Sequence, residues 1–169
     1  MTVSKRFVRT ALLNTLLVAS AAHSQMERKA FIPEEVFAGR AEGQGEMQFV
    51  LGKRRSFTVE SLGTMQADGH LRLEQNVRFE GKAVQSRYWV MWKIKPGNYS
   101  ATLTEAAGPV IVRTEGSRLT LRYPLTRWGL VMHQTLDLAK DGRTVANSGI
   151  IRFLGIPVGQ LRETIRLKH

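Results

Sequence analysis

The fold is decided by Leu71-Arg72-Leu73-Glu74-Gln75-Asn76-Val77-Arg78-Phe79, which is followed by the break Glu80-Gly81-Lys82 and by a second β-like stretch, Ala83 to Ile94. Apolar side chains occupy nearly every second position of the first run. Because side chains of a strand alternate between its two faces, this period predicts two antiparallel strands with one apolar and one polar side.

The same alternation recurs along the chain and predicts one all-β domain. Breaks that carry glycine, such as Asp68-Gly69, Glu115-Gly116 and Asp141-Gly142, are strong hairpin signals because glycine accepts positive φ. We expect ten strands, at residues 44–51, 55–65, 70–79, 83–94, 99–106, 110–115, 118–125, 130–139, 144–153 and 158–168.

Sequentially connected antiparallel strands leave exposed edges unless the sheet closes. The pattern therefore predicts an antiparallel up-and-down barrel of about 8–10 strands, with a two-sheet sandwich as the alternative. One or two short helices are expected. One of them lies near Pro33–Phe37, where proline begins the turn and acidic residues follow it.

The central hairpin has a predicted register. With Glu80-Gly81 as the turn, Glu74 stands opposite Arg87, and with Gly81-Lys82 the two become diagonal neighbours. In both cases they share one face of the sheet with Trp89. Such a pair is either an exposed ion pair or the polar floor of a cavity.

The N-terminal residues predict export. Lys5, Arg6 and Arg9 precede an apolar stretch from Ala11 to Ala22 that is too short to span a bilayer. We expect a signal peptide over residues 1–24, cleavage near Ser24-Gln25, and a periplasmic or secreted domain over residues 25–169. An uncleaved anchor or a buried amphipathic helix is the alternative.

Composition limits the partners. Without residues 1–24 the chain keeps 22 basic and 14 acidic residues, a charge of +8, which suits anionic lipid head groups or cell-wall polymers. Export argues against nucleic acid as the partner. The sequence has no cysteine, so a disulfide, a lipid anchor on cysteine and a thiolate nucleophile are all excluded. We expect a monomer.

Several short motifs, in order, resemble a bacterial family of exported proteins, many of them described as lipoproteins of unknown function. They are Val36-Phe37-Ala38-Gly39, Gly43-Gln44-Gly45, Leu73-Glu74, Arg87-Tyr88-Trp89, Tyr99 and Phe153-Leu154-Gly155-Ile156-Pro157-Val158-Gly159. The resemblance spans residues 36–167. It implies a calycin, or lipocalin-like, barrel and a recurrent cluster of Glu74, Arg87 and Trp89.

The chain also departs from that family. It lacks the lipidated cysteine, and Gln134-Thr135-Leu136-Asp137 stands where members carry an acidic pair followed by tryptophan. The spacing from Glu74 to Trp89 is one residue longer than the family's, and a β-bulge there would shift the register past Gln85.

The sequence contains few candidate catalytic residues. His70 and His133 are isolated, and their spacing fits no metal site. The strand acids Glu60, Glu74, Glu105 and Asp137 form no pair at a set distance, so a two-carboxylate hydrolase has no support. No catalytic residue, metal or cofactor is predicted.

A binding protein is the better-supported class, because a barrel of this size can enclose one small ligand. The expected ligand is an apolar or amphipathic envelope molecule, a lipid or fatty acyl group. A structural or partner-binding envelope protein is the alternative, and a hydrolase or isomerase acting on a small apolar substrate is a third class. The candidate ligand-binding residues are Glu74, Arg87, Trp89, Tyr88, Met91 and Tyr123, with Phe79, Val90 and Trp92 as further wall positions.

The segment Thr126-Arg127-Trp128-Gly129 is predicted to be a loop tip at the barrel mouth. A tryptophan beside an arginine is an amphipathic pair typical of a membrane interface. Arg127 and Trp128 are therefore the candidates for contact with an anionic membrane surface. A tryptophan folded back over the mouth is the alternative.

Overall fold

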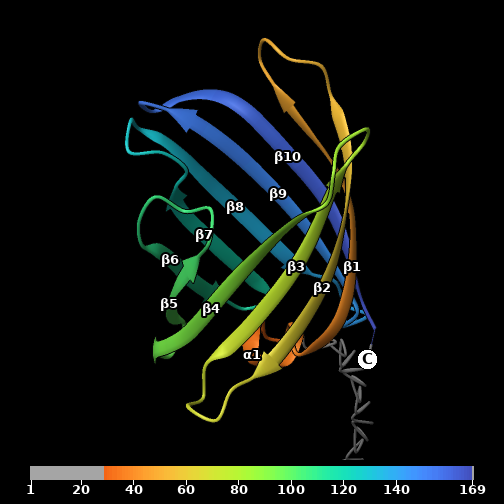
Figure 1. Cartoon of the computed structure of the whole chain (residues 1–169). Helices are drawn as coiled ribbons and strands as arrows, with labels where there is room; N and C mark the ends of the chain where they lie inside the picture. Colours follow the sequence, from red (N-terminus) through yellow and green to blue (C-terminus); the bar gives the residue numbers. More distant parts are fainter. Residues whose placement is uncertain (1–28, 169) are drawn as a thin grey trace, which may run out of the picture.

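The protein is a closed antiparallel barrel of ten strands (Figure 1). The computed structural model describes residues 29–168. Sequential strands are neighbours throughout, and β1 pairs with β10 to close the sheet. The strands are β1 (Gly39–Phe49), β2 (Arg55–Met65), β3 (Leu71–Phe79), β4 (Gln85–Lys95), β5 (Asn98–Leu103), β6 (Val110–Glu115), β7 (Arg118–Pro124), β8 (Leu130–Leu138), β9 (Thr144–Phe153) and β10 (Ile156–Leu167).

This architecture confirms the predicted fold class. All ten expected segments form strands, in an up-and-down order without crossovers, and the sandwich alternative is wrong. Alternation of buried and exposed residues is regular, as in β7, where Leu119, Leu121 and Tyr123 face inward. Apolar residues of one parity therefore fill the interior, as the sequence pattern requires.

The register of the β3–β4 hairpin differs by one residue from both predicted forms. Gln75 stands opposite Arg87, and Glu74 stands opposite Tyr88. The expectation that Glu74 and Arg87 share a face is wrong, because a one-residue shift moves a side chain to the other side of the sheet. The cause is the connection over residues 80–84, which is longer than a two-residue turn. The ladder from Leu71↔Met91 to Val77↔Gln85 runs without a bulge.

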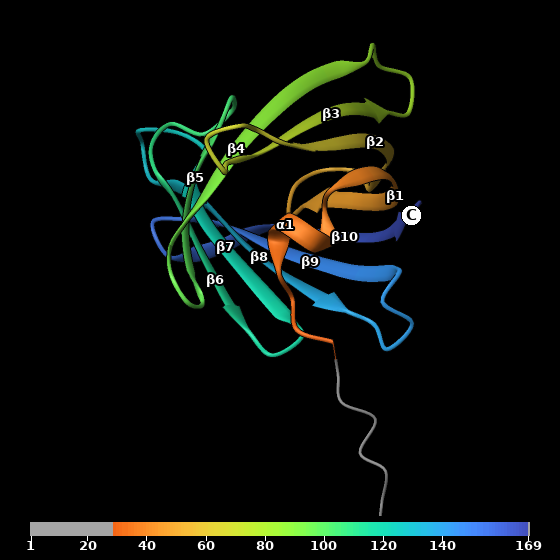
Figure 2. The same cartoon turned by 90° about the horizontal axis from the view of Figure 1, so that it is seen from below.

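A single helical turn closes one end of the barrel. Helix α1 (Pro33–Val36) lies across the opening when the barrel is seen from below (Figure 2). Phe31, Val36 and Phe37 are buried against the interior of the strands. The hydroxyl of Tyr99 donates a hydrogen bond of 3.2 Å to Glu34, so the helix is held to the wall by a polar contact as well.

Close backbone approach also fixes this end. A Cβ at position 63 would overlap the carbonyl oxygen of Phe37, so only glycine allows the segment after α1 to lie on β2. The other end, at the top in Figure 1, has no helix across it among the described residues. It carries the β1–β2, β3–β4, β5–β6, β7–β8 and β9–β10 loops. We call it the open end.

The predicted signal peptide, residues 1–24, and its cleavage site lie outside the described residues. Within residues 29–168, no helix has the length and apolar character needed to cross a membrane.

Candidate functional site

The barrel interior contains two apolar clusters with a polar layer between them. On β3, Gln75 lies between Leu73 of the large cluster and Val77 of the small one. On β10, Glu163 lies in the same way between Ile165 and Leu161. The small cluster consists of Phe57, Val59, Val77 and Leu161, with Met47 and Phe79 packed against it.

One half of the polar layer is centred on Gln75. Its Oε1 atom accepts two hydrogen bonds of 2.8 Å, from Nε of Arg87 and from Nε1 of Trp89. Its amide nitrogen donates to the hydroxyl of Ser61 at 3.0 Å. The guanidinium of Arg87 also lies 3.6 Å from the carboxylate of Glu105. Gln75 therefore orients both an arginine and a tryptophan inside the barrel.

The other half is a chain of buried polar groups that ends on Glu163. Tyr123 donates to Gln134, Gln134 donates to Asn147, and Asn147 donates a 2.8 Å hydrogen bond to Oε2 of Glu163. Desolvation raises the pKa of the Glu163 carboxyl, against the opposing effects of the Asn147 hydrogen bond and the charge of Arg87. Burial likewise raises the pKa of Tyr123 to about 12.

The space left inside these layers is small. A cavity of about 50 Å³ is bounded by both halves of the polar layer and by apolar residues such as Phe37 and Leu119. That volume holds about one or two water molecules, and no acyl chain. The closed half of the barrel is therefore a filled core.

A larger cavity opens at the mouth, next to the small apolar cluster. It has a volume of about 570 Å³, and its lining residues include three cationic and no acidic side chains. The lining consists of Met47, Phe49, Gly52, Lys53, Arg55, Phe79, Lys82 and Gln85. This mouth cavity joins an apolar floor to a cationic margin, and it can hold a molecule with an apolar body and an anionic group.

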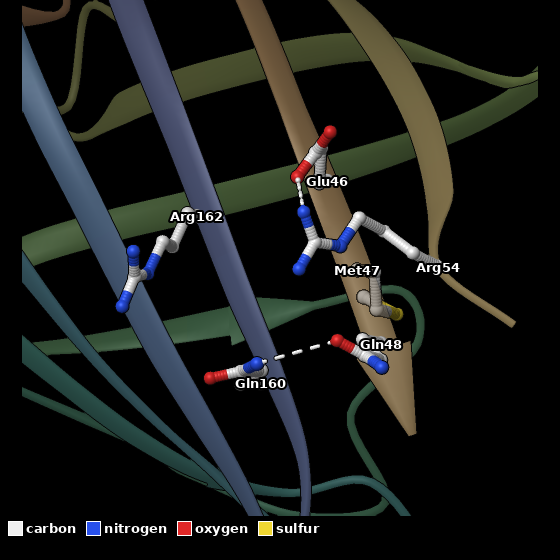
Figure 3. A pocket seen from close by; sticks show the side chains of 6 residues that line it. All are labelled: Glu46, Met47, Gln48, Arg54, Gln160 and Arg162. Atoms are coloured by element: carbon white, nitrogen blue, oxygen red, sulfur yellow. Dashed lines mark hydrogen bonds and ion pairs between the residues drawn. The ribbon is translucent and has the colours of Figure 1, made fainter. Parts of the chain in front are cut away.

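A polar groove lies on the outer wall between β1 and β10 (Figure 3). Arg54 reaches over this groove and pairs with Glu46 at 3.2 Å, and Gln160 donates to Gln48 at 3.5 Å. Its volume is about 130 Å³. Arg54 and Glu46 are exposed and pair with each other, and Arg162 on the facing strand is exposed as well, so the groove offers no desolvated group to a ligand.

The structure divides the predicted ligand-binding residues between two faces. Arg87, Trp89, Met91 and Tyr123 face the interior and border the polar layer. Of the further wall positions, Phe79 lines the mouth cavity. Val90 and Trp92 lie on the outer face of β4 with Tyr88, so their prediction as wall residues is wrong.

Glu74 and Tyr88 lie on the outside of the barrel. Glu74 pairs with Arg72 at 3.1 Å, and the guanidinium of Arg72 lies 5.1 Å from the ring centre of Tyr88. Of the predicted cluster of Glu74, Arg87 and Trp89, only Arg87 and Trp89 lie together, and both donate to the Gln75 side chain. Glu74 does not belong to this cluster.

Arg127 and Trp128 lie in the loop between β7 and β8 at the open end, as predicted. The Trp128 side chain is 84% exposed and does not fold back over the mouth. Their contact with a membrane stays a prediction.

The sequence interpretation missed most of the interior polar layer. Glu163 has the same parity as Leu161 and Ile165, and Asn147 the same as Val145 and Ile151, so both were identifiable as inward polar residues. The cationic residues of the mouth could not be recognised from strand periodicity, because Lys53 and Lys82 lie in loops. The placement of these two loops depends on closure of the barrel.

His70 and His133 do not converge with other ligands. His70 contacts Asp68 at 3.2 Å beside a turn, and desolvation together with Arg122 and Arg152 lowers the pKa of His133. Over residues 29–168, no group of three or more histidine, cysteine or acidic side chains could hold a metal ion.

The chain belongs to a family of proteins of unknown function, DUF3833, whose model matches residues 10–167. No functionally curated protein matches the sequence. Two solved structures share the fold. The S-type phycobiliprotein lyase CPES of Guillardia theta superposes with a TM-score of 0.64 at 10% identity, over 80% of this chain and 90% of that one. A protein of unknown function from the DUF3598 family of Nostoc punctiforme gives 0.61 at 15% identity, over 88% of this chain and 53% of that one.

These likenesses show a calycin-like fold and no more, because both identities are low.

Proposed function

We propose that the protein is an exported binding protein for an amphipathic anion, a fatty acid or lipid of the cell envelope, that is held in the mouth of the barrel. The mouth cavity carries the proposal, since it combines Met47, Phe49 and Phe79 with Lys53, Arg55 and Lys82. Export rests on the basic and apolar character of residues 1–24.

The two parts of such a ligand would be bound differently. Each methylene that leaves water for the apolar floor contributes ~0.8 kcal/mol. The anionic group would be attracted by the three cations at the margin, and that attraction weakens as salt is added. The likeness in fold to a phycobiliprotein lyase supports binding in a general sense only, because a closed barrel of this size can enclose a small ligand.

Titration with a fluorescent fatty acid whose emission depends on its surroundings tests the proposal. We expect binding that weakens with salt and is impaired in a Lys53→Gln, Lys82→Gln double variant. The matched control is Lys140→Gln with Arg143→Gln, which removes the same charge from the loop between β8 and β9 at the other end. Native mass spectrometry of protein purified from its own host, before and after organic extraction, would identify the ligand.

A second candidate function has its own support. The closed half of the barrel is a filled core with a cavity of only about 50 Å³, as a structural or partner-binding envelope protein would have. The absence of acyl binding at about tens of micromolar would defeat the carrier proposal and leave this alternative.

A further inference from the structure

Exposed apolar side chains gather at the open end. Of fourteen exposed large apolar side chains in the described residues, eight lie in the loops of this end or at the strand ends beside them. They are Phe49, Val50, Leu51, Val84, Trp128, Phe153, Leu154 and Ile156. Leu51 is completely exposed, and Leu154 is 72% exposed. Apolar residues gathered in this way mark an interaction surface more often than residues scattered singly.

The β9–β10 turn keeps an apolar residue where the backbone disfavours one. Leu154 has a φ of 47° and Gly155 a φ of 88°, the positive angles that a tight two-residue hairpin requires. Asparagine or glycine fits the first of these positions, and a leucine there carries backbone strain. Because most of the Leu154 side chain is exposed, packing within the molecule offsets little of this strain. A contact of its exposed part with something outside the molecule would explain why leucine occupies this position.

Two loops of the open end touch each other. The amide of Leu154 donates a 3.1 Å hydrogen bond to the carbonyl of Gly129. Its side chain covers the face of Gly129, since a Cβ there would stand 2.6 Å from Cδ2 of Leu154. Trp128 and Leu154 therefore belong to one surface. We call the loops 50–54, 80–84, 125–129 and 154–155 the apolar rim (Figure 1).

The apolar rim is also cationic. Its four loops contain Lys53, Arg54, Lys82 and Arg127 against the single acid Glu80. The loops of the opposite end, 66–70, 96–97, 116–117 and 139–143, contain two basic and two acidic residues. The remaining loop of the open end, 104–109, adds Glu105, which pairs with Arg87. Positive charge and exposed apolar groups thus coincide at one end.

We propose that the apolar rim docks the barrel, mouth first, on the surface of an anionic lipid bilayer. Leu51, Trp128 and Leu154 would enter the interfacial region, where tryptophan is favoured, and the rim cations would contact anionic head groups. Exposed apolar tips combined with cations match such a surface, and the contact of Leu154 with Gly129 joins the loop that carries Trp128 to the turn that carries Leu154. The inference extends the proposed function by naming the surface to which the mouth is turned.

Vesicle flotation tests the docking. We expect the protein to float with vesicles of mixed phosphatidylglycerol and phosphatidylcholine, and to bind vesicles of phosphatidylcholine alone roughly ten-fold or more weakly. Added salt should release it. Leu51→Ser combined with Trp128→Ser should weaken binding to the mixed vesicles by roughly ten-fold. The matched control is Ile94→Ser, because Ile94 is 65% exposed but lies near the other end of β4, and this variant should bind like the parent protein.

Leu154→Asn separates docking from folding. Asparagine suits the positive φ at this position, so the variant should melt at or above the temperature of the parent protein and still bind vesicles less tightly. Trp128 gives a second measurement, since its emission should shift to shorter wavelength on the mixed vesicles and lose that shift in Trp128→Phe.

The outcomes are distinct from those of the ligand test. The Leu51→Ser, Trp128→Ser variant should keep its affinity for the fluorescent fatty acid in solution, because neither residue lines the mouth cavity. Equal flotation of the parent protein and this variant, or no flotation with anionic vesicles, would overturn the docking proposal. Loss of fatty acid binding with retained flotation would overturn the proposed function alone.

Discussion

Asn147 donates a 2.8 Å hydrogen bond from Nδ2 to Oε2 of Glu163 in the middle of the barrel, and both side chains are buried. The amide stabilises the carboxylate, but desolvation is the larger effect and raises the pKa of Glu163. A carboxyl whose pKa is higher in the folded than in the unfolded protein binds more protons when folded. The folded state is therefore favoured at low pH and loses that advantage as pH rises.

Glu163→Gln should remove the decrease in stability that the Glu163 carboxyl causes as pH rises. We expect the stability of the parent protein to fall between the unfolded and the folded pKa of Glu163, and the variant to show a flatter profile and higher stability at neutral pH. Glutamine keeps an oxygen that can accept from Asn147. Urea unfolding over a range of pH measures the effect. A variant less stable than the parent at neutral pH would show that the Glu163 charge stabilises the barrel, contrary to this prediction.

Gln75→Ala should lower the free energy of unfolding more than a substitution on the exposed face does. It removes the acceptor shared by Arg87 and Trp89, and the buried indole of Trp89 is then left without a partner. We expect a loss of about 1–3 kcal/mol in the free energy of unfolding. Asn76→Ala is the matched control, because the adjacent Asn76 accepts a hydrogen bond from Ser86 on the exposed face. Equal losses in the two variants would contradict the interior role of Gln75.

Glu74 and Arg87 should be energetically independent. They lie on opposite faces of the sheet, with Glu74 paired to Arg72 and Arg87 bonded to Gln75. We expect Glu74→Gln to cost ~0–1 kcal/mol and a double-mutant cycle with Arg87→Ala to give a coupling of about zero. Thermal or chemical unfolding of the four proteins provides the cycle. A coupling well above the error would restore the pairing that the sequence suggested.

The periodicity of the strands was enough to predict the barrel, because alternation of residues such as Leu119, Leu121 and Tyr123 depends on one strand alone. The register of the β3–β4 hairpin could not be predicted in the same way. The connection between Phe79 and Gln85 can form turns that differ in length by one residue, and each one-residue shift moves the side chains of one strand to the other face. The observed form pairs Leu73 with Trp89, buries Trp89 and leaves Tyr88 exposed.

The candidate site was only partly predictable for a related reason. Arg87, Trp89, Met91 and Tyr123 are predicted ligand-binding residues that face the interior, and their contact with a ligand stays a prediction. Their partners come from strands far away in the sequence, since Glu163 and Asn147 lie on the last two strands. The mouth cavity likewise unites two hairpins around Phe49 and Phe79. Only closure of the barrel brings these groups together.

Gly63→Ala should loosen the closed end. Its Cβ would overlap the backbone carbonyl of Phe37, which cannot move without displacing α1. We expect a loss of ~1–3 kcal/mol in the free energy of unfolding. Gly52→Ala is the control, because its Cβ would lie 3.4 Å from its nearest neighbour, the Cβ of Phe49, and it should cost about 0.5 kcal/mol or less. Faster hydrogen exchange in α1 should accompany the loss, and an unchanged stability would place the Phe37 carbonyl elsewhere.

Affinity for fatty acids should rise with chain length and then level off. Each methylene that fits against Met47 and Phe79 contributes ~0.8 kcal/mol, but Phe57, Val59 and Val77 fill the barrel behind them. Longer chains should therefore gain nothing from methylenes that remain outside the mouth. Calorimetric titration of a series of saturated fatty acids measures the levelling. Glu163→Gln should leave it unchanged, because the polar layer lies beyond the filled region. Continued gain with the longest chains, together with sensitivity to Glu163→Gln, would place the chain deep in the interior and contradict binding at the mouth.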